Sequence, residues 1–283
     1  MALDQRCKEC FERNFERLII RSPLTTAQVS EFSTFFKHLV NNCAQLSNPE
    51  IQRELQTKLV AMNGIADPYQ DEKKQSNQLA LELYREWKPK VLASDNPYQL
   101  ALRLALAGNV MDYGANQQFD IQKTIDKALG AIIAIDHSVM LRQRIRKANR
   151  VLYLGDNAGE IVFDKLLIET IMHPNITYVV RGGPAINDAT MEDSEATGMD
   201  WVADVISNGY DAPSTVLSKS DPEFRSYFDS ADLIISKGQG NFEGLMIEKD
   251  PRIFFLLMVK CDFISEKIGA PKGSFIVMNY GKD

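Results

Sequence analysis

From Arg150 onward, the chain alternates short apolar segments with longer stretches that have helical periodicity. Apolar and β-branched residues run together in each short segment, which is typical of buried strands. The expected strands are 151–154, 177–180, 205–207, 233–236, 253–259 and 275–279, and the expected helices are 160–172, 190–203, 222–230, 241–248 and 262–268. This alternation predicts an α/β fold, with a Rossmann-like, three-layer α/β/α domain over residues 148–283 and a mostly parallel sheet.

Residues 1–147 show helical periodicity and little strand signal. Phe11, Phe15 and Leu18 recur at spacings of three and four, and later apolar stripes repeat this pattern. Prolines separate the expected helices, and one helix around 79–87 is expected to end near Pro89. We therefore expect an N-terminal all-α helical domain, joined to the sheet domain at the polar, basic run 142–147.

Composition narrows the range of partners. The chain has 283 residues, of which 45% are hydrophobic, and this is enough for a sizeable core. Its net charge of -6 argues against a nucleic-acid partner. The N-terminus is too polar for a signal peptide, and the longest strongly apolar run, 253–259, is too short to span a membrane. We expect a cytoplasmic protein without a membrane partner, and the sequence sets no expectation for its oligomeric state.

The chain has four cysteines, of which Cys7 and Cys10 form a lone C-x-x-C. A structural zinc site needs four ligands, and the sequence holds no second C-x-x-C and no H-x-x-x-H. On a helix, Cys7 and Cys10 face one side together with Phe11. Two interpretations stay open: a small buried pair, or a metal or redox role.

The stretch 151–160 places polar residues at the end of the first expected strand of the sheet domain. Gly155 ends the apolar run, Asp156 and Asn157 follow it, and a helix begins near Glu160. Ligands of open α/β sheets gather at the carboxyl ends of strands. A carboxylate beside a carboxamide offers two hard oxygens to Mg²⁺ or Mn²⁺. The alternative is a strand-to-helix turn with Asn157 as its N-cap.

The next expected strand, 177–180, is followed by Arg181 and then by Asn187 and Asp188. Asp188 is either the N-cap of a helix with an acidic first turn, or a second carboxylate at the edge where Asp156 lies. The strand 233–236 ends in a lysine–glycine loop that runs from Lys237 to Glu243 and enters a helix. Backbone N–H groups at a helix start bind anions, and a lysine adds a point charge. The three strand ends together predict a metal site that faces a phosphate site.

These three motifs resemble a known family. G-D-N-x-x-E at 155–160, R-G-x-P-x-x-N-D-x-T at 181–190 and K-G-x-x-N-x-E at 237–243 are similar to motifs of the metal-dependent damage-control phosphatases called domain of unknown function 89. The resemblance continues upstream in 67–69, Lys74, Ser76, Asn77 and 108–112, so it covers nearly the whole chain. The early C-x-x-C resembles one prokaryotic branch of this family.

The resemblance implies an α/β/α domain with a helical partner and a phosphomonoester hydrolase that acts on small phosphorylated metabolites. Sugar phosphates, damaged cofactor phosphates and nucleotides are the expected substrates. The implied cofactor is a divalent metal ion, Mg or Mn, with Co or Ni as alternatives. By resemblance, the metal ligands are Asp156, Asn157 and Asp188, and the phosphate-facing residues are Lys237 and Asn241.

Further residues complete the candidate site. Glu160 or Glu243 is expected to transfer a proton, and the sequence does not choose between them. The expected catalytic set is Asp156, Asn157, Glu160, Asp188 and Asp112, and the expected substrate-binding set is Lys237, Gly238, Asn241, Glu243, Arg181 and Asn109. No histidine falls in a motif, so a phosphohistidine intermediate is not expected.

The stretch 108–112 predicts a contribution from the helical half. Asn109 and Asp112 are spaced i, i+3, which places them on one helical face. We expect both to lie within one or two side-chain lengths of Asp156, where a helical lid would discriminate among esters and exclude water. The alternative is a simple helix end, with Gly108 as breaker and Asn109 as cap.

Two other functions fit parts of the sequence. The run 151–156 superficially resembles the first motif of a Rossmann-type methyltransferase, but that function requires an acidic residue at the end of the second strand, where Arg181 stands. A non-catalytic metabolite-binding protein is the second alternative, because a fold does not fix a function.

Overall fold

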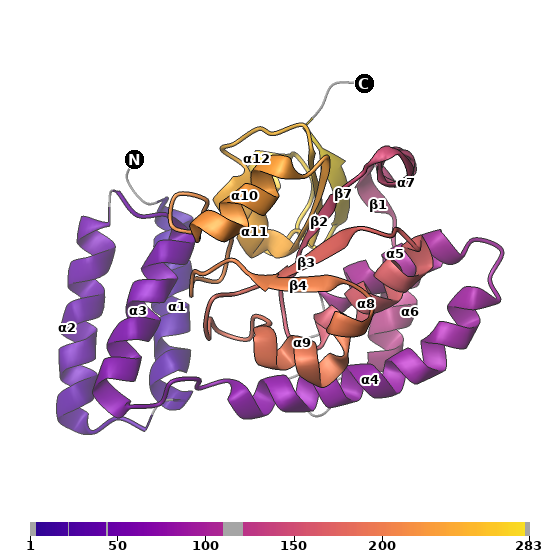
Figure 1. Cartoon of the computed structure of the whole chain (residues 1–283). Helices are drawn as coiled ribbons and strands as arrows, with labels where there is room; N and C mark the ends of the chain where they lie inside the picture. The colour runs from indigo at the N-terminus through magenta and orange to yellow at the C-terminus, as the bar shows by residue number, and fades with distance from the viewer. Residues whose placement is uncertain (1–3, 22, 44, 110–120, 281–283) are drawn as a thin grey trace.

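A computed structural model describes residues 4–21, 23–43, 45–109 and 121–280 (Figure 1). Within these residues, seven strands form one sheet in the order β1-β7-β6-β5-β2-β3-β4. The strands are β1 (Ile133–Asp136), β2 (Val151–Leu154), β3 (Ile176–Val180), β4 (Asp204–Ser207), β5 (Leu233–Lys237), β6 (Ile253–Met258) and β7 (Phe275–Asn279). Strands β2 to β6 are parallel to one another, and β7 runs antiparallel to β6. The predicted α/β fold with a mostly parallel sheet is confirmed.

The described helices are α1 (Gln5–Arg21), α2 (Thr26–Asn42), α3 (Asn48–Asn63), α4 (Gln70–Leu92), α5 (Pro97–Gly108), α6 (Ile121–Gly130), α7 (Ser138–Lys147), α8 (Glu160–Ile171), α9 (Met191–Thr197), α10 (Pro222–Ser230), α11 (Gly238–Leu245) and α12 (Asp262–Ile268). Local signals set several of their ends. Thr25 and Gln28 form a capping box before α2, and Gly64 ends α3 in the left-handed conformation. None of the described helices is long and apolar enough to cross a membrane.

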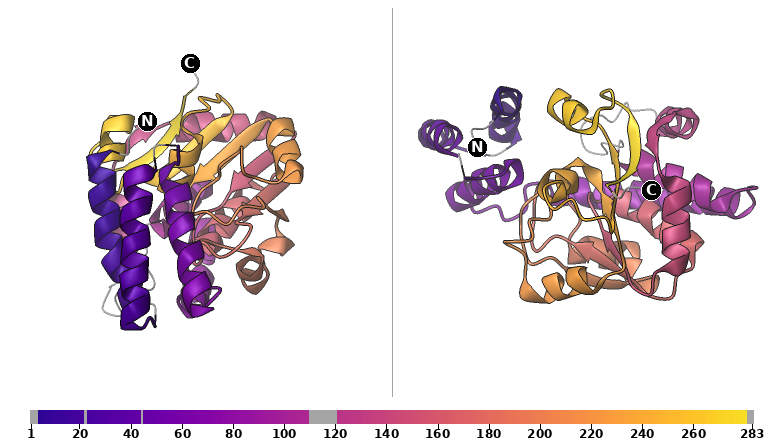
Figure 2. Two further views of the ribbon diagram at one scale, coloured as in Figure 1. Left: turned by 90° about the vertical axis from the view of Figure 1, so that its left-hand side faces the viewer. Right: turned by 90° about the horizontal axis from the view of Figure 1, so that it is seen from above.

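Successive side chains of each strand point to opposite faces of the sheet, so the sheet has a hydrophobic core on each face. Val151 and Tyr153 of β2 point into a core shared with α4, α5 and α8. Leu152 and Leu154 point to the opposite face, where α10, α11 and α12 pack. The result is three layers, helix on sheet on helix, which the two views of Figure 2 show from the side and from above.

The helical half divides into two parts. Helices α1 to α3 form a small bundle around Phe11, Phe32 and Ile51, and they stand side by side at one end of the molecule (Figure 2). Helices α4, α5 and α6 instead share their core with the sheet, where Trp87 and Leu104 are buried. These three helices are therefore a layer of the sheet domain. Their sequences show the same helical periodicity as those of the bundle, so the sequence alone does not separate the two groups.

Strand β1 and helix α4 differ from the sequence expectation, α9 ends at Thr197 instead of 203, and α11 begins at Gly238 instead of 241. Strand β1 lies in the stretch expected to be helical, and it extends the sheet by pairing in parallel with β7. Helix α4 continues through Pro89 to Leu92, one turn beyond its expected end. Proline is tolerated there because its fixed φ suits a helix and only one backbone hydrogen bond is lost, while Ala93 still donates to the Pro89 carbonyl.

The shared core predicts that α5 and the sheet unfold as one unit. Leu104 is 0% exposed, so Leu104→Ala should lower the free energy of unfolding by about 2–5 kcal/mol. Leu92, also helical but 64% exposed, is the matched control, and Leu92→Ala should cost less than about 0.5 kcal/mol. Urea unfolding followed by circular dichroism measures both variants. Equal stability of the two would contradict a common core.

Candidate active site

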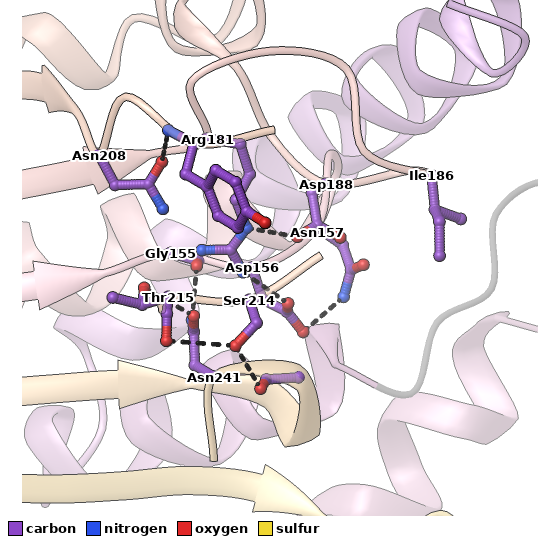
Figure 3. A network of polar contacts seen from close by, with 12 residues as sticks. Gly155, Asp156, Asn157, Arg181, Ile186, Asp188, Asn208, Ser214, Thr215 and Asn241 are labelled. Atoms are coloured by element: carbon purple, nitrogen blue, oxygen red, sulfur yellow. Dashed lines mark hydrogen bonds and ion pairs between the residues drawn. The ribbon is translucent and has the colours of Figure 1, made fainter. Parts of the chain in front are cut away.

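The site lies where β2 and β3 end at the same edge of the sheet. Asp156 and Asp188 follow these strands, and an antiparallel backbone bridge joins Asn157 to Asp188. The Ala158 N–H donates to the Asn187 carbonyl at 2.9 Å, and the Ala189 N–H donates to the Asp156 carbonyl at 2.8 Å. Figure 3 shows Asp156, Asn157 and Asp188 gathered at this edge. The predicted meeting of the two carboxylates is therefore present in the structure.

Contacts from distant segments hold the turn after β2. A Cβ on Gly155 would lie 2.3 Å from the Tyr178 hydroxyl, so no side chain fits at this position. The Asn77 side chain of α4 accepts a 2.7 Å hydrogen bond from the Gly159 N–H, where φ is +74°. Gly159 is the N-cap of α8, so Asn157 is not a helix cap and its side chain is left for the site.

Contacts within and outside the loop after β3 also hold Asp188 in place. Helix α9 is capped by Thr190, which forms a capping box with Asp193, so Asp188 is not a cap either. Ile186 has a φ of +52°, which is rare and strained for a β-branched residue. Gln56 of α3 restrains this part of the loop by accepting from the Ile186 N–H and donating to the Pro184 carbonyl.

Asp156 is buried and accepts hydrogen bonds from three sides. The Asn109 and Asn157 amides donate to its Oδ2 at 3.0 and 2.9 Å, and the Arg181 guanidinium lies 3.4 Å from its Oδ1. Burial, with added repulsion from Asp188 and Glu160, raises the pKa of Asp156 to about 7. Burial also raises the pKa of Asp188 above its ordinary value, although Arg181 opposes this shift. Two neighbouring carboxylates thus lack full charge compensation.

Arg181 binds the two carboxylates from the buried side. Its Nε donates to Asp188 at 2.5 Å, and its side chain is only 1% exposed. Its Nη1 is buried and has no partner among the described residues. The geometry therefore does not favour the predicted contact between Arg181 and substrate. The buried guanidinium instead holds Asp156 and Asp188 in position.

Lys237 does not face the cleft, and this revises the prediction of a phosphate contact. Its side chain is 0% exposed, and its three donor positions are used by Glu160 Oε1 at 2.6 Å, Asp164 Oδ1 at 2.5 Å and the Ala105 carbonyl at 3.0 Å. Burial disfavours the ammonium, but Asp164 and Glu160 more than compensate and raise the pKa of Lys237 above its ordinary value. The lysine is a buried counter-ion for two carboxylates.

Asp164 is a buried acid that no sequence motif marked. Its oxygens accept from the Tyr153 and Tyr178 hydroxyls at 2.8 and 3.0 Å, and also from Lys237. Burial raises the pKa of Asp164 to about 6, although Lys237 acts in the opposite direction. Burial also opposes ionisation of Glu160, yet the Lys237 ammonium lowers the pKa of Glu160 below its ordinary value. Lys237 therefore favours the ionised form of both acids, and its effect prevails over burial at Glu160.

The glycine loop after β5 packs against Asp156 and the residue before it. The Asn241 amide is 0% exposed and donates to the carbonyls of Gly155 and Lys237, so its predicted phosphate contact is not favoured. Gly238 has a φ of +79°, and a Cβ there would lie 1.8 Å from Asp156 Oδ2. A side chain at this position would displace the carboxylate, which explains the need for glycine.

A cleft of about 550 Å³ leads to the two carboxylates. Its walls come from α1, α3 and the edge of the sheet, and its floor includes Asp156, Asn157 and Asp188. Glu243 lies on one wall, and burial raises its pKa above the ordinary value. Of the two candidates for proton transfer, Glu243 lines the cleft whereas Glu160 is 0% exposed. Asn109 lies next to Asp156 as expected, and Asp112 falls outside the described residues.

Lys260 is a cleft residue that sequence reasoning missed. It lies two residues beyond β6, it is exposed, and it lines the cleft. Its ammonium acts against the raised pKa of both Asp156 and Asp188, so it lies within electrostatic reach of both. Its position just after an expected strand of the same parallel sheet was the available signal, but no glycine or acid accompanies it.

The fold and the site define a class: an α/β/α protein with paired acids beneath a cleft at the carboxyl ends of parallel strands. The family model of the damage-control phosphatase ARMT1-like domain matches residues 5–276. The chain therefore belongs to this family, as its motifs predicted.

Archaeal relatives agree with this assignment. A damage-control phosphatase of Pyrococcus horikoshii is 37% identical over 219 residues, which cover 76% of this chain and 75% of the relative. A damage-control phosphatase of Archaeoglobus fulgidus is 32% identical and the match covers 81% of each chain. A crystal structure of a duf89 family protein from P. horikoshii is similar with a TM-score of 0.88 and 30% identity, covering 99% of this chain and 100% of that one.

The contact between Gly238 and Asp156 predicts a matched pair of glycine variants. Gly238→Ala adds a clash with the carboxylate to the strain of a positive φ. Gly269→Ala, at a φ of +76° with nothing within 4 Å, adds the strain alone. Urea unfolding should show a loss of about 1 kcal/mol for Gly269→Ala and about 1–3 kcal/mol more for Gly238→Ala. Equal losses would show that Asp156 is not packed against this turn.

Proposed function

We propose that this protein is a divalent-metal-dependent phosphomonoesterase that acts on small phosphorylated metabolites. Its family and its relatives named damage-control phosphatase support a phosphatase role. The observation that carries the proposal is the pair Asp156 and Asp188, which line a cleft and whose backbone segments are joined by the bridge between Asn157 and Asp188. Arg181, which stands where a nucleotide-binding methyltransferase requires an acid, binds both carboxylates and so argues against that alternative.

The charge of the buried cluster supports a divalent cation. Its described members are four carboxylates and two cations, an excess of two negative charges when all are ionised: Asp156, Glu160, Asp164 and Asp188 against Arg181 and Lys237. A buried charge without a partner costs several kcal/mol. A bound divalent cation would remove this excess, so the donor set fits such an ion.

Asp156, Asn157 and Asp188 are the protein ligands in this proposal. Their carboxylate and amide oxygens are hard ligands, which suit Mg²⁺ or Mn²⁺, with Co²⁺ or Ni²⁺ as alternatives. Within the described ranges, no group of three His, Cys, Asp or Glu side chains is arranged to hold a metal. The third ligand in this proposal is the oxygen of the Asn157 amide, whose nitrogen donates to Asp156 and Glu160. When bound there, a divalent cation would neutralise phosphate oxygens and help to activate the attacking group.

The chain's own residues supply the rest of the chemistry. We propose that the exposed Lys260 ammonium holds the non-bridging phosphate oxygens, the role that the sequence assigned to Lys237. Asn109 and Asn157 keep Asp156 in place, and Glu160 in turn accepts from both amides at 3.0 and 2.9 Å. The cleft of about 550 Å³ has the size of a small-molecule site, which favours sugar phosphates, cofactor phosphates or nucleotides over larger esters.

The direct test is release of inorganic phosphate from a panel of such esters, with and without Mn²⁺. Asp156→Ala should lower the rate at least ~100-fold because it removes several kcal/mol of charge stabilisation. Asp200→Ala, at an exposed position, is the matched control and should retain full activity. Normal activity in a folded Asp156→Ala protein would end the proposal.

A second pair of variants tests the assignment of Lys260. Lys260→Ala should lower kcat/KM by about 10²-fold, because one stabilising charge on the phosphoryl group is lost. Lys260→Arg should recover part of this loss, and Lys219→Ala, an exposed lysine elsewhere, should change nothing. Unchanged kinetics for Lys260→Ala would show that another group holds the phosphate.

A further inference from the structure

Three of the four cysteines line the cleft that leads to Asp156. Cys7 and Cys10 come from α1, and Cys261 directly follows Lys260 at the start of α12. Cys43, in contrast, is buried in the core of the three-helix bundle. All four thiols are free in the structure. Thiols from the two ends of the chain therefore meet at one opening, and the proposed hydrolysis uses none of them.

A continuous chain of hydrogen bonds connects Cys7 to Cys261. The Asn48 amide donates to Cys7 Sγ at 3.4 Å and to Glu243 Oε2 at 2.8 Å. The Gln239 amide donates to Glu243 Oε1 at 2.9 Å and to Cys261 Sγ at 3.6 Å. The two sulfur atoms thus flank Glu243 on the wall of the cleft, each held by an amide.

The residues next to these two cysteines in the sequence also contact each other. Arg6, which precedes Cys7, donates to the carbonyl of Asp262, which follows Cys261, at 3.5 Å. The same guanidinium forms a 2.8 Å ion pair with Glu266 of α12. The start of α1 is therefore attached to α12 next to both cysteines in the sequence.

We propose that Cys7 and Cys261 are a modification site, at which a peroxide forms a reversible disulfide that ties α1 to α12 across the mouth of the cleft. Only the effect of this disulfide on activity rests on the proposed phosphatase function. Within α1, the Cys10 sulfur instead accepts from the Asn14 amide at 3.8 Å. The hydrogen-bonded chain through Asn48, Glu243 and Gln239 links Cys7 to Cys261 and does not include Cys10.

The chemistry balances with hydrogen peroxide as oxidant. The Cys261 thiolate, which is the more exposed, attacks one peroxide oxygen and the O–O bond breaks. Hydroxide is released, and Cys261 becomes a sulfenic acid. Burial raises the pKa of the Cys7 thiol, so Cys7 reacts second. It loses its proton as it attacks the Cys261 sulfur, and a second hydroxide leaves as the S–S bond forms. Two thiols lose two electrons in total, and one peroxide becomes two waters once the released protons are taken up.

This disulfide would change the wall of the active-site cleft. Both sulfur atoms now accept from amides that also hold Glu243, so bringing them together breaks the contacts of Asn48 and Gln239 with sulfur. It also fixes the bundle against the loop that carries Lys260. We therefore expect oxidation to restrict entry of the substrate and to lower turnover without unfolding the protein.

Peptide mapping by mass spectrometry after treatment of the full-length protein with hydrogen peroxide tests the disulfide without reference to activity. The expected result is a cross-linked pair of peptides that contain Cys7 and Cys261, which disappears with dithiothreitol. Cys10→Ser and Cys43→Ser should still form the cross-link, and Cys7→Ser and Cys261→Ser should not. Four thiols that remain alkylatable, or a bridge between Cys7 and Cys10 alone, would overturn the proposal.

Phosphate release measures the effect on function. Oxidation should lower it by about tenfold or more, dithiothreitol should restore it, and the Cys7→Ser and Cys261→Ser proteins should resist the oxidant while matching the reduced enzyme. A mapped disulfide with unchanged turnover would overturn the effect on the cleft. A reduced enzyme without any phosphatase activity would instead refute the proposed function, and the mapping result would stand on its own.

Discussion

The ammonium of Lys237, buried between Glu160 and Asp164, is the interaction on which the site depends. It joins β5 to α8 through two carboxylates and reaches α5 through the Ala105 carbonyl. Replacing one partner of such a buried network leaves unpaired charge and costs about 3–5 kcal/mol, much more than an exposed ion pair contributes. The position of α8 relative to the sheet, and with it the floor of the cleft, is therefore set by charge as well as by packing.

This buried pairing controls the groups above it. Because Lys237 keeps Glu160 ionised, Glu160 accepts from the Asn109 and Asn157 amides, and these in turn donate to Asp156. Each step leads closer to the cleft, from a lysine that no solvent reaches to a carboxylate on its floor. The helical segments before the sheet take part directly, since Asn109 follows α5. The site is thus a product of the whole chain, and its residual negative charge is what a divalent cation would balance.

The sequence predicts the residues that meet at the ends of parallel strands, but it does not predict which charged side chains are buried in the folded protein. The meeting of Asp156 with Asp188 followed from parallel strands that end at one edge, and the proximity of Asn109 followed from its motif. A lysine before two glycines has the pattern of an anion site, and only the burial of Asp164 opposite it shows that Lys237 is a counter-ion. Strand β1 was missed because four residues between two helices carry little periodicity and gain their partner only from β7, far along the chain.

The melting temperature of the metal-free protein, measured as Mn²⁺ is added, tests whether a cation binds at Asp156 and Asp188. An ion that binds only the folded state stabilises it by about 2.7 kcal/mol at a hundredfold excess over its Kd. The melting temperature should rise by several degrees with Mn²⁺, and this rise should be lost in Asp156→Asn and Asp188→Asn. A melting temperature that does not respond to Mn²⁺, or that rises equally in both variants, would contradict a cation site at the paired carboxylates.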